Sequence, residues 1–191
     1  MNSRPANART EARTAQFVVF EGAVRILAGS IAEAAGAARR ALDGNPAATI
    51  TIFRRDTAEV VDLDLRGTEQ ETAARYAEPE TSPARRGRPK LGVIAREVTL
   101  LPRHWDWLSR QPGGASVTLR KLVEAARRSE AGAARARTDA AYRFMSAMAG
   151  DLPGFEEAAR ALFADERERL AGLIAPWPPD ISGEVLRFLD A

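Results

Sequence analysis

Few side chains of this 191-residue chain could do chemistry, because it has no cysteine and a single histidine, His104. Asp106 lies two positions away, and residues at i and i+2 of a helix do not face one another, so the pair forms no local proton relay. A metal site would need oxygen ligands alone. Asp62 and Asp64 share one face of an expected strand and are the candidates for Mg²⁺. The plain alternative is the solvent side of a half-buried strand.

Other catalytic motifs are missing from the sequence. Gly113-Gly114 lacks the Gly-Lys-Ser/Thr of a phosphate-binding loop, and no Gly-x-Ser-x-Gly nucleophile turn occurs. We therefore expect no enzyme activity, no cofactor and no identifiable small-molecule substrate. An enzyme with a carboxylate metal site at Asp62 and Asp64 is the alternative within the enzyme class.

Basic residues are concentrated in the middle of the chain. Residues 1–83 carry ten arginines against twelve acids, a net charge of −2, and residues 138–191 carry five against ten, a net charge of −5. Residues 84–137 carry thirteen Lys or Arg against four acids, a net charge of +9. Such an excess indicates an anionic partner, either a nucleic acid or the acidic helices of the same or another chain.

The sharpest basic motif is Arg86-Gly87-Arg88-Pro89-Lys90. Extended arginine side chains around a Gly-Arg-Pro core fit a narrow A·T minor groove, whose negative potential attracts guanidinium groups. The motif resembles the core of an AT-hook, and this resemblance implies minor-groove contacts from Arg86, Gly87, Arg88 and Lys90. The plain alternative is a solvated, charged linker.

Residues 97–128 resemble the ribbon-helix-helix DNA-binding proteins in the order of their expected elements. A short strand precedes a helix opened by Pro102, and a Gly turn leads to a second helix capped by Ser116. That second helix reads Ser-x-x-Leu-Arg-x-Leu-Val-x-x-Ala from Ser116 to Ala126, close to the family's Ser-x-x-Ile-Arg-x-Leu-Val-x-x-Ala pattern. The alternative is a plain helical hairpin in an α-helical core.

The ribbon-helix-helix resemblance implies a homodimer whose paired strands read bases and whose second helix holds a phosphate at its N-terminus. Ser116, Val117 and Thr118 would supply backbone amides, and either Thr99 with Glu97 or Arg96 with Val98 would face DNA. The expected DNA-binding residues are Arg86, Gly87, Arg88, Lys90, Arg96, Thr99, Arg103, Ser116, Thr118, Arg120 and Lys121.

Periodicity and caps predict the elements that must position these residues. Residues 17–20 and 24–27 form a hairpin signal, and Ser30 to Glu33 is a capping box that opens a helix. Alternation predicts strands at 49–53 and 59–65, which completes a β-β-α-β-β module in an α+β fold. The predicted division is a disordered tail (1–14), the α+β module (15–66), a basic linker (67–92), the ribbon-helix-helix-like segment (93–130) and a helical C-terminal region (131–191).

The chain carries no targeting or membrane signal. Its first sixteen residues are polar, and no apolar run approaches the roughly 18 residues that a membrane span needs. The absence of cysteine fits a reducing compartment. We expect a soluble, cytoplasmic protein with no membrane partner.

Long sequence strings resemble one uncharacterised prokaryotic family, domain of unknown function 2239. The strings are residues 86–93, 96–108, 113–116 and 142–157. The family has no established activity, so the function is argued from the basic segment. The leading hypothesis is a DNA-binding homodimer, a transcriptional regulator or nucleoid-associated factor. The alternative is a protein-interaction or assembly module that binds no nucleic acid.

Overall fold

The run Phe17-Val18-Val19-Phe20 is apolar at every position, which is typical of a strand buried on both faces. The computed structural model describes residues 16–77 and 96–190 and places this run in the middle of an antiparallel sheet. β1 (Phe17–Glu21) lies between β2 (Val24–Gly29) and β3 (Ile50–Arg54). Gly22, at a φ of 54°, forms the turn of the predicted hairpin.

The two faces of the sheet contribute to two hydrophobic clusters. Val18, Phe20 and Phe53 point to one side, and Phe17, Val19 and Ile52 point to the other. The register places Val18 opposite Phe53 and Val19 opposite Ile52. Each cross-strand pair therefore delivers its side chains to the same cluster.

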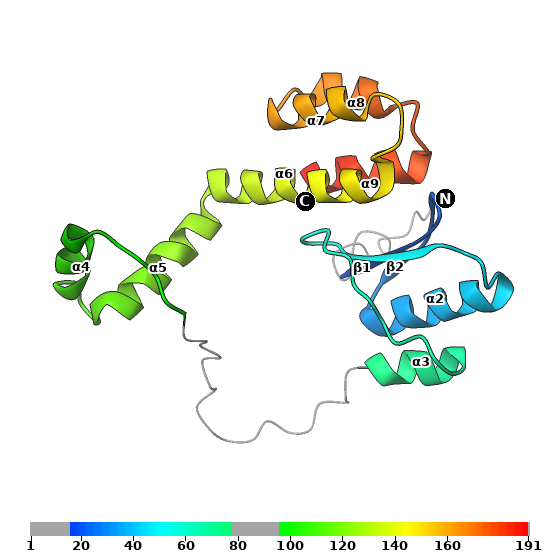
Figure 1. Ribbon diagram of the computed structural model, residues 1–191, viewed down its shortest axis with the longest axis horizontal. Coiled ribbons are helices and arrows are strands. Elements are labelled where there is room, and N and C mark those ends of the chain that lie inside the picture. Colours follow the sequence, from blue (N-terminus) through cyan, green and yellow to red (C-terminus); the bar gives the residue numbers. More distant parts are fainter. Residues whose placement is uncertain (1–15, 78–95, 191) are drawn as a thin grey trace, which may run out of the picture. The chain divides into compact units, whose positions relative to one another are not determined.

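One face of the sheet is covered by α2 (Ile31–Gly44), as Figure 1 shows. The predicted capping box is confirmed: Ser30 accepts from the Glu33 amide, and the Glu33 carboxylate accepts from the Ser30 amide. Ala34 and Ala38 pack against the sheet because small side chains let the helix approach closely. On α2, a Cβ built at Gly36 would lie 3.5 Å from that of Ala73 in α3 (Glu69–Tyr76).

The opposite face of the sheet packs against α6 (Glu130–Ala149) and α9 (Pro179–Asp190) (Figure 1). The ring of Phe144 lies 5.4 Å from Phe20, 5.0 Å from Phe53 and 5.6 Å from Phe188, measured between centroids. These rings join strands from the start of the chain to a helix at its end. α7 (Phe155–Phe163) and α8 (Arg167–Ile174) extend the same core.

The chain divides into two compact units. Among the described residues, 16–77 and 134–190 form the first, hereafter the composite unit, and 96–133 form the second, the inserted unit. The segments predicted as an N-terminal α+β module and a C-terminal helical region thus share one core. The shared core depends on contacts between residues more than 80 positions apart, which local periodicity does not reveal.

The inserted unit contains α4 (Pro102–Ser109) and α5 (Gly114–Arg128). Pro102 opens α4 at its first position, as predicted. Among residues 96–133, Leu108 is the single apolar side chain that the structure buries.

Three local predictions are wrong. Residues 59–65 form no strand beyond an isolated bridge between Val60 and Phe53. The predicted linker begins with a helix, α3, which Thr68 opens through a second capping box. Finally, α5 begins at Gly114 rather than after Ser116. The strand expected before Pro102 is irregular at residues 96–101 of the single chain, and its pairing with a second copy stays a prediction.

Candidate nucleic-acid interface

The predicted DNA-binding residues fall into three groups. Arg86, Gly87, Arg88 and Lys90 lie outside the described residues. Arg96 and Thr99 are exposed in an irregular segment, and Arg103 is exposed on α4. The remaining residues, Ser116, Thr118, Arg120 and Lys121, belong to α5.

The start of α5 differs from the expected phosphate-binding terminus. Gly113 is the N-cap, at a φ of 88°, and no side chain caps the helix. Because the helix starts at Gly114, the amides of Val117 and Thr118 lie beyond the first free N–H groups. The Thr118 side chain is also buried, at 9% exposure. Of the predicted amide donors, Ser116 alone remains in the first turn, where its backbone N–H has no partner within the helix and can meet an anion.

The cationic side of α5 comprises Arg120, Lys121, Arg127 and Arg128. Arg127 and Arg128 both contact Glu124 of the same helix, at 3.0 and 3.6 Å, and their side chains are 73% and 82% exposed. Arg120 and Lys121 are exposed and make no ion pair with any described residue. One carboxylate therefore faces four cations, which leaves a local excess of positive charge.

Two carboxylates on the acidic helices of the composite unit have local partners. Glu157 accepts from Arg160 at 2.6 Å, and Glu166 accepts from Arg169 at 2.8 Å. Both pairs lie one turn apart on a helix surface, where such contacts form without tertiary packing. Under the assembly alternative, the expected partners of the basic segment on these helices are Glu156, Glu157, Glu166 and Glu168. Of these, Glu157 and Glu166 are already engaged with a neighbouring arginine.

A second side of the inserted unit is apolar and uncovered. An open hollow of about 270 Å³ lies on this side, lined by Leu100, His104, Trp107, Leu108, Leu119 and Leu122. Two of these side chains, Trp107 (51%) and Leu122 (49%), are about half exposed. Elsewhere on the unit, large apolar side chains are exposed to a similar degree: Val98 (53%), Leu101 (49%), Trp105 (42%) and Val123 (56%). We call the side with the hollow the α4–α5 apolar face. Monomeric proteins rarely leave so many bulky apolar groups in water.

An ionic cluster that the sequence did not reveal lies in the composite unit. Glu184 of α9 is fully buried, and its carboxylate accepts from Arg25 and Arg55, each at 3.2 Å, and from Arg187. The Arg187 guanidinium also lies 4.2 Å from the Phe188 ring centroid, and burial lowers its pKa. The residues come from β2, the turn after β3 and α9, so no spacing in the sequence indicates the cluster.

One of the two candidate Mg²⁺ ligands, Asp64, takes part in ion pairs. The Asp64 carboxylate contacts Arg66 at 2.7 Å and Arg75 at 3.8 Å. The hydrogen bonds from Arg66 hold the pKa of Asp64 well below its usual range. Across residues 16–77 and 96–190, no group of three or more His, Asp or Glu side chains is placed to hold a metal ion.

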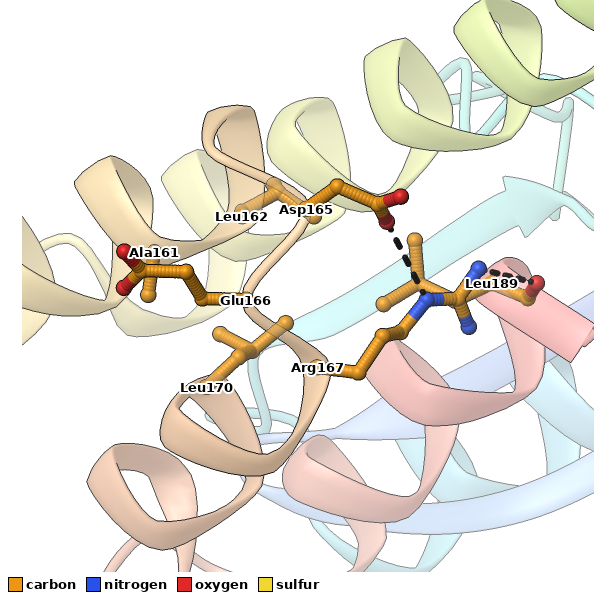
Figure 2. Close-up of a pocket in the computed structure, with 7 residues that line it drawn as sticks. All are labelled: Ala161, Leu162, Asp165, Glu166, Arg167, Leu170 and Leu189. Atoms are coloured by element: carbon orange, nitrogen blue, oxygen red, sulfur yellow. Dashed lines mark hydrogen bonds and ion pairs between the residues drawn. The ribbon is translucent and has the colours of Figure 1, made fainter.

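A small hollow at the α7–α8 turn has no room for a water molecule. Figure 2 shows Arg167 spanning its rim, 3.5 Å from the Asp165 carboxylate and 3.0 Å from the Leu189 carbonyl oxygen. Because its polar groups are paired with one another, this hollow is part of the helix packing.

Comparison with known proteins gives one match. The model of the family described as "Uncharacterized protein conserved in bacteria (DUF2239)" matches residues 16–189, so the chain belongs to this family. No curated protein and no solved structure matches the chain. Within the part of the chain that the structure describes, every helix is too short or too polar to cross a membrane.

Proposed function

We propose that this member of the DUF2239 family binds DNA through its basic segment, residues 85–137. The observation that carries the proposal is the cationic side of α5. There Arg120 and Lys121 have no carboxylate partner among the described residues, and Arg127 and Arg128 share one. Exposed cations along one helix, spaced by one or two turns, can each meet a phosphate of a duplex.

The chemistry of the segment favours the nucleic-acid backbone over base edges. The guanidinium group of arginine donates two parallel hydrogen bonds that match the oxygens of a phosphate. Residues 84–137 carry thirteen basic side chains, nine more than their acidic side chains. Phosphate contacts position a protein without reading sequence. The protein therefore binds DNA with little sequence preference beyond A·T-rich minor grooves, which Arg86 and Arg88 enter. It acts in the cytoplasm as a nucleoid-associated factor or transcriptional regulator.

A second copy of the chain covers the α4–α5 apolar face, so the DNA-bound form is a homodimer. The face carries both a hollow of about 270 Å³ and bulky exposed groups, Trp107 and Leu122. Cavity and protrusion on one patch are what a two-fold interface requires, because each copy presents the same surface. The cations of α5 lie off this face and stay available to DNA.

The DNA proposal is tested with the double variant Arg120→Gln/Lys121→Gln. Fluorescence anisotropy against a duplex at several salt concentrations gives the slope of log K against log salt. If both cations contact phosphate, the slope falls by about 1.8, at 0.9 per lost contact. Arg160→Gln, at another exposed arginine that lies in the composite unit, is the control and leaves the slope unchanged. An unaltered slope in the double variant refutes the role of α5.

The homodimer is tested with Leu122→Asp, which places a charge in the α4–α5 apolar face. Sedimentation analysis of the wild-type chain gives a dimer, and the variant gives a monomer, because a buried unpaired carboxylate opposes association. Phe163→Asp, at a 58% exposed position of the composite unit, is the control and keeps the dimer. A wild-type monomer at micromolar concentration contradicts this part of the proposal.

The second candidate function is a protein-interaction module that binds no nucleic acid. The same apolar face favours it, since half-exposed tryptophans are typical of protein interfaces. The two functions differ in one observable: the interaction module gives no salt-dependent binding to DNA.

A further inference from the structure

The Glu184 cluster in the composite unit has more positive charge than its protein partners neutralise. Arg25, Arg55 and Arg187 all contact the Glu184 carboxylate. The Asp180 carboxylate lies beside them and accepts from the backbone amide of Arg25 at 2.9 Å. Three cations against two carboxylates leave one net positive charge at a partly buried place, where an unmatched charge is costly.

The cluster also retains hydrogen-bond donors. Each guanidinium has five N–H groups, and Arg25 and Arg55 each give one to Glu184. Arg187 gives one to Glu184 and another to the Arg55 carbonyl oxygen at 3.0 Å. Arg25 is an exposed residue, and no other nitrogen of Arg55 or Arg187 is buried without a partner, so these donors reach solvent. The Arg25, Arg55 and Arg187 side chains are 39%, 11% and 26% exposed.

We propose that Arg25, Arg55 and Arg187 form an oxyanion-binding site that takes a phosphate group, with Glu184 holding the guanidinium groups in position. A buried carboxylate that fixes several arginines lowers the entropy that they lose on meeting a ligand. Phosphate suits the site because its oxygens accept from several guanidinium forks at once. Its negative charge also offsets the surplus of the cluster. This site is independent of the basic segment and does not rest on DNA binding.

Burial and repulsion within the cluster support the same assignment. Burial lowers the pKa of Arg187, and the neighbouring charges of Arg55 and Arg25 lower it further. An anion that binds between these groups relieves that repulsion, whereas a cation or a neutral ligand does not.

The test is a titration of the full chain with inorganic phosphate, at constant ionic strength made up with sodium chloride. Backbone amide NMR shifts of residues 25, 55 and 183–187 are followed. Wild-type protein gives saturable shifts in the millimolar range. Arg25→Gln weakens the affinity about tenfold, the loss of one charge-assisted contact. Arg160→Gln binds as wild type does. Shifts that do not saturate, or equal affinity in Arg25→Gln, overturn the proposal.

Two further variants guard against misfolding and locate the source of the phosphate. Arg25→Lys keeps the charge without the fork and gives an intermediate affinity, with a far-ultraviolet circular dichroism spectrum like that of the wild type. Anisotropy of Arg25→Gln against DNA separates two sources of the group. Unchanged DNA affinity assigns the site to a small phosphorylated ligand, and parallel loss of DNA affinity assigns it to the nucleic-acid backbone. Failure of DNA binding in the wild type leaves the phosphate titration fully informative.

Discussion

Replacing Glu184 by Gln removes the charge on which three arginines converge while nearly preserving the shape of the side chain. Glu184 is fully buried, and Arg25, Arg55 and Arg187 come from three separate elements. Removing one partner of a buried ion pair costs about 3–5 kcal/mol, because the other charge stays without compensation. Arg25 and Arg187 are 39% and 26% exposed, so water recovers part of this loss and the lower end, about 3 kcal/mol, is expected.

The loss is measured by thermal and urea unfolding of the full chain, followed by circular dichroism. For a chain of this size 1 kcal/mol shifts Tm by about 2–4 °C, so Glu184→Gln lowers Tm by about 6–12 °C. Glu157→Gln is the control, because the Glu157 and Arg160 side chains are 49% and 66% exposed and their pair contributes at most about 1 kcal/mol. A Tm within about 2 °C of the wild type would show that the cluster does not join the two ends of the chain.

Further predictions concern the core and the helix caps. Phe144→Ala removes a ring that contacts Phe20, Phe53 and Phe188, and urea unfolding is expected to show a loss of about 3–5 kcal/mol; a loss below about 1 kcal/mol would contradict the shared core. The hydrogen bond from the Ser30 backbone amide lowers the pKa of the Glu33 carboxyl below its ordinary 4.5. The capping box therefore stabilises the folded chain fully above pH 4.5, and this stabilisation is lost as the pH falls through the lower pKa of the folded state. Glu33→Gln is expected to flatten this acid limb of a stability–pH curve, and an identical acid limb would count against the assignment.

The secondary structure that local chemistry encodes was predictable, and the tertiary arrangement was not. The Ser30 capping box and the proline at the start of α4 are short-range signals that act within one turn. The second box, Thr68 to Glu71, is equally local and was available in the sequence, but the surrounding charge and Gly content favoured a linker. The strand expected at 59–65 failed because alternation alone does not supply a pairing partner.

In the candidate sites, too, local features were predictable and tertiary ones were not. The exposed cations of α5 follow from the apolar stripe of Leu119, Leu122 and Val123, because residues off that stripe face solvent. The burial of Thr118 was not predicted, because the sequence pattern placed the start of the helix at Ser116. The helix in fact begins at Gly114, after Gly113 in left-handed backbone conformation, so Thr118 lies beyond its first turn. The Glu184 cluster joins residues about 130 to 160 positions apart, so no local signal could have indicated it.

The most direct test of DNA binding is the salt dependence of wild-type affinity for a duplex, measured by fluorescence anisotropy at about 50 and 200 mM salt. With Arg96, Arg103 and the four cations of α5 on phosphates, the affinity falls by about 10³-fold or more over this range, as for six contacts. Tighter binding to A·T-rich than to G·C-rich duplexes would assign part of the DNA affinity to Arg86 and Arg88. Absence of binding at the lower salt concentration would contradict the DNA proposal and leave the interaction module as the function.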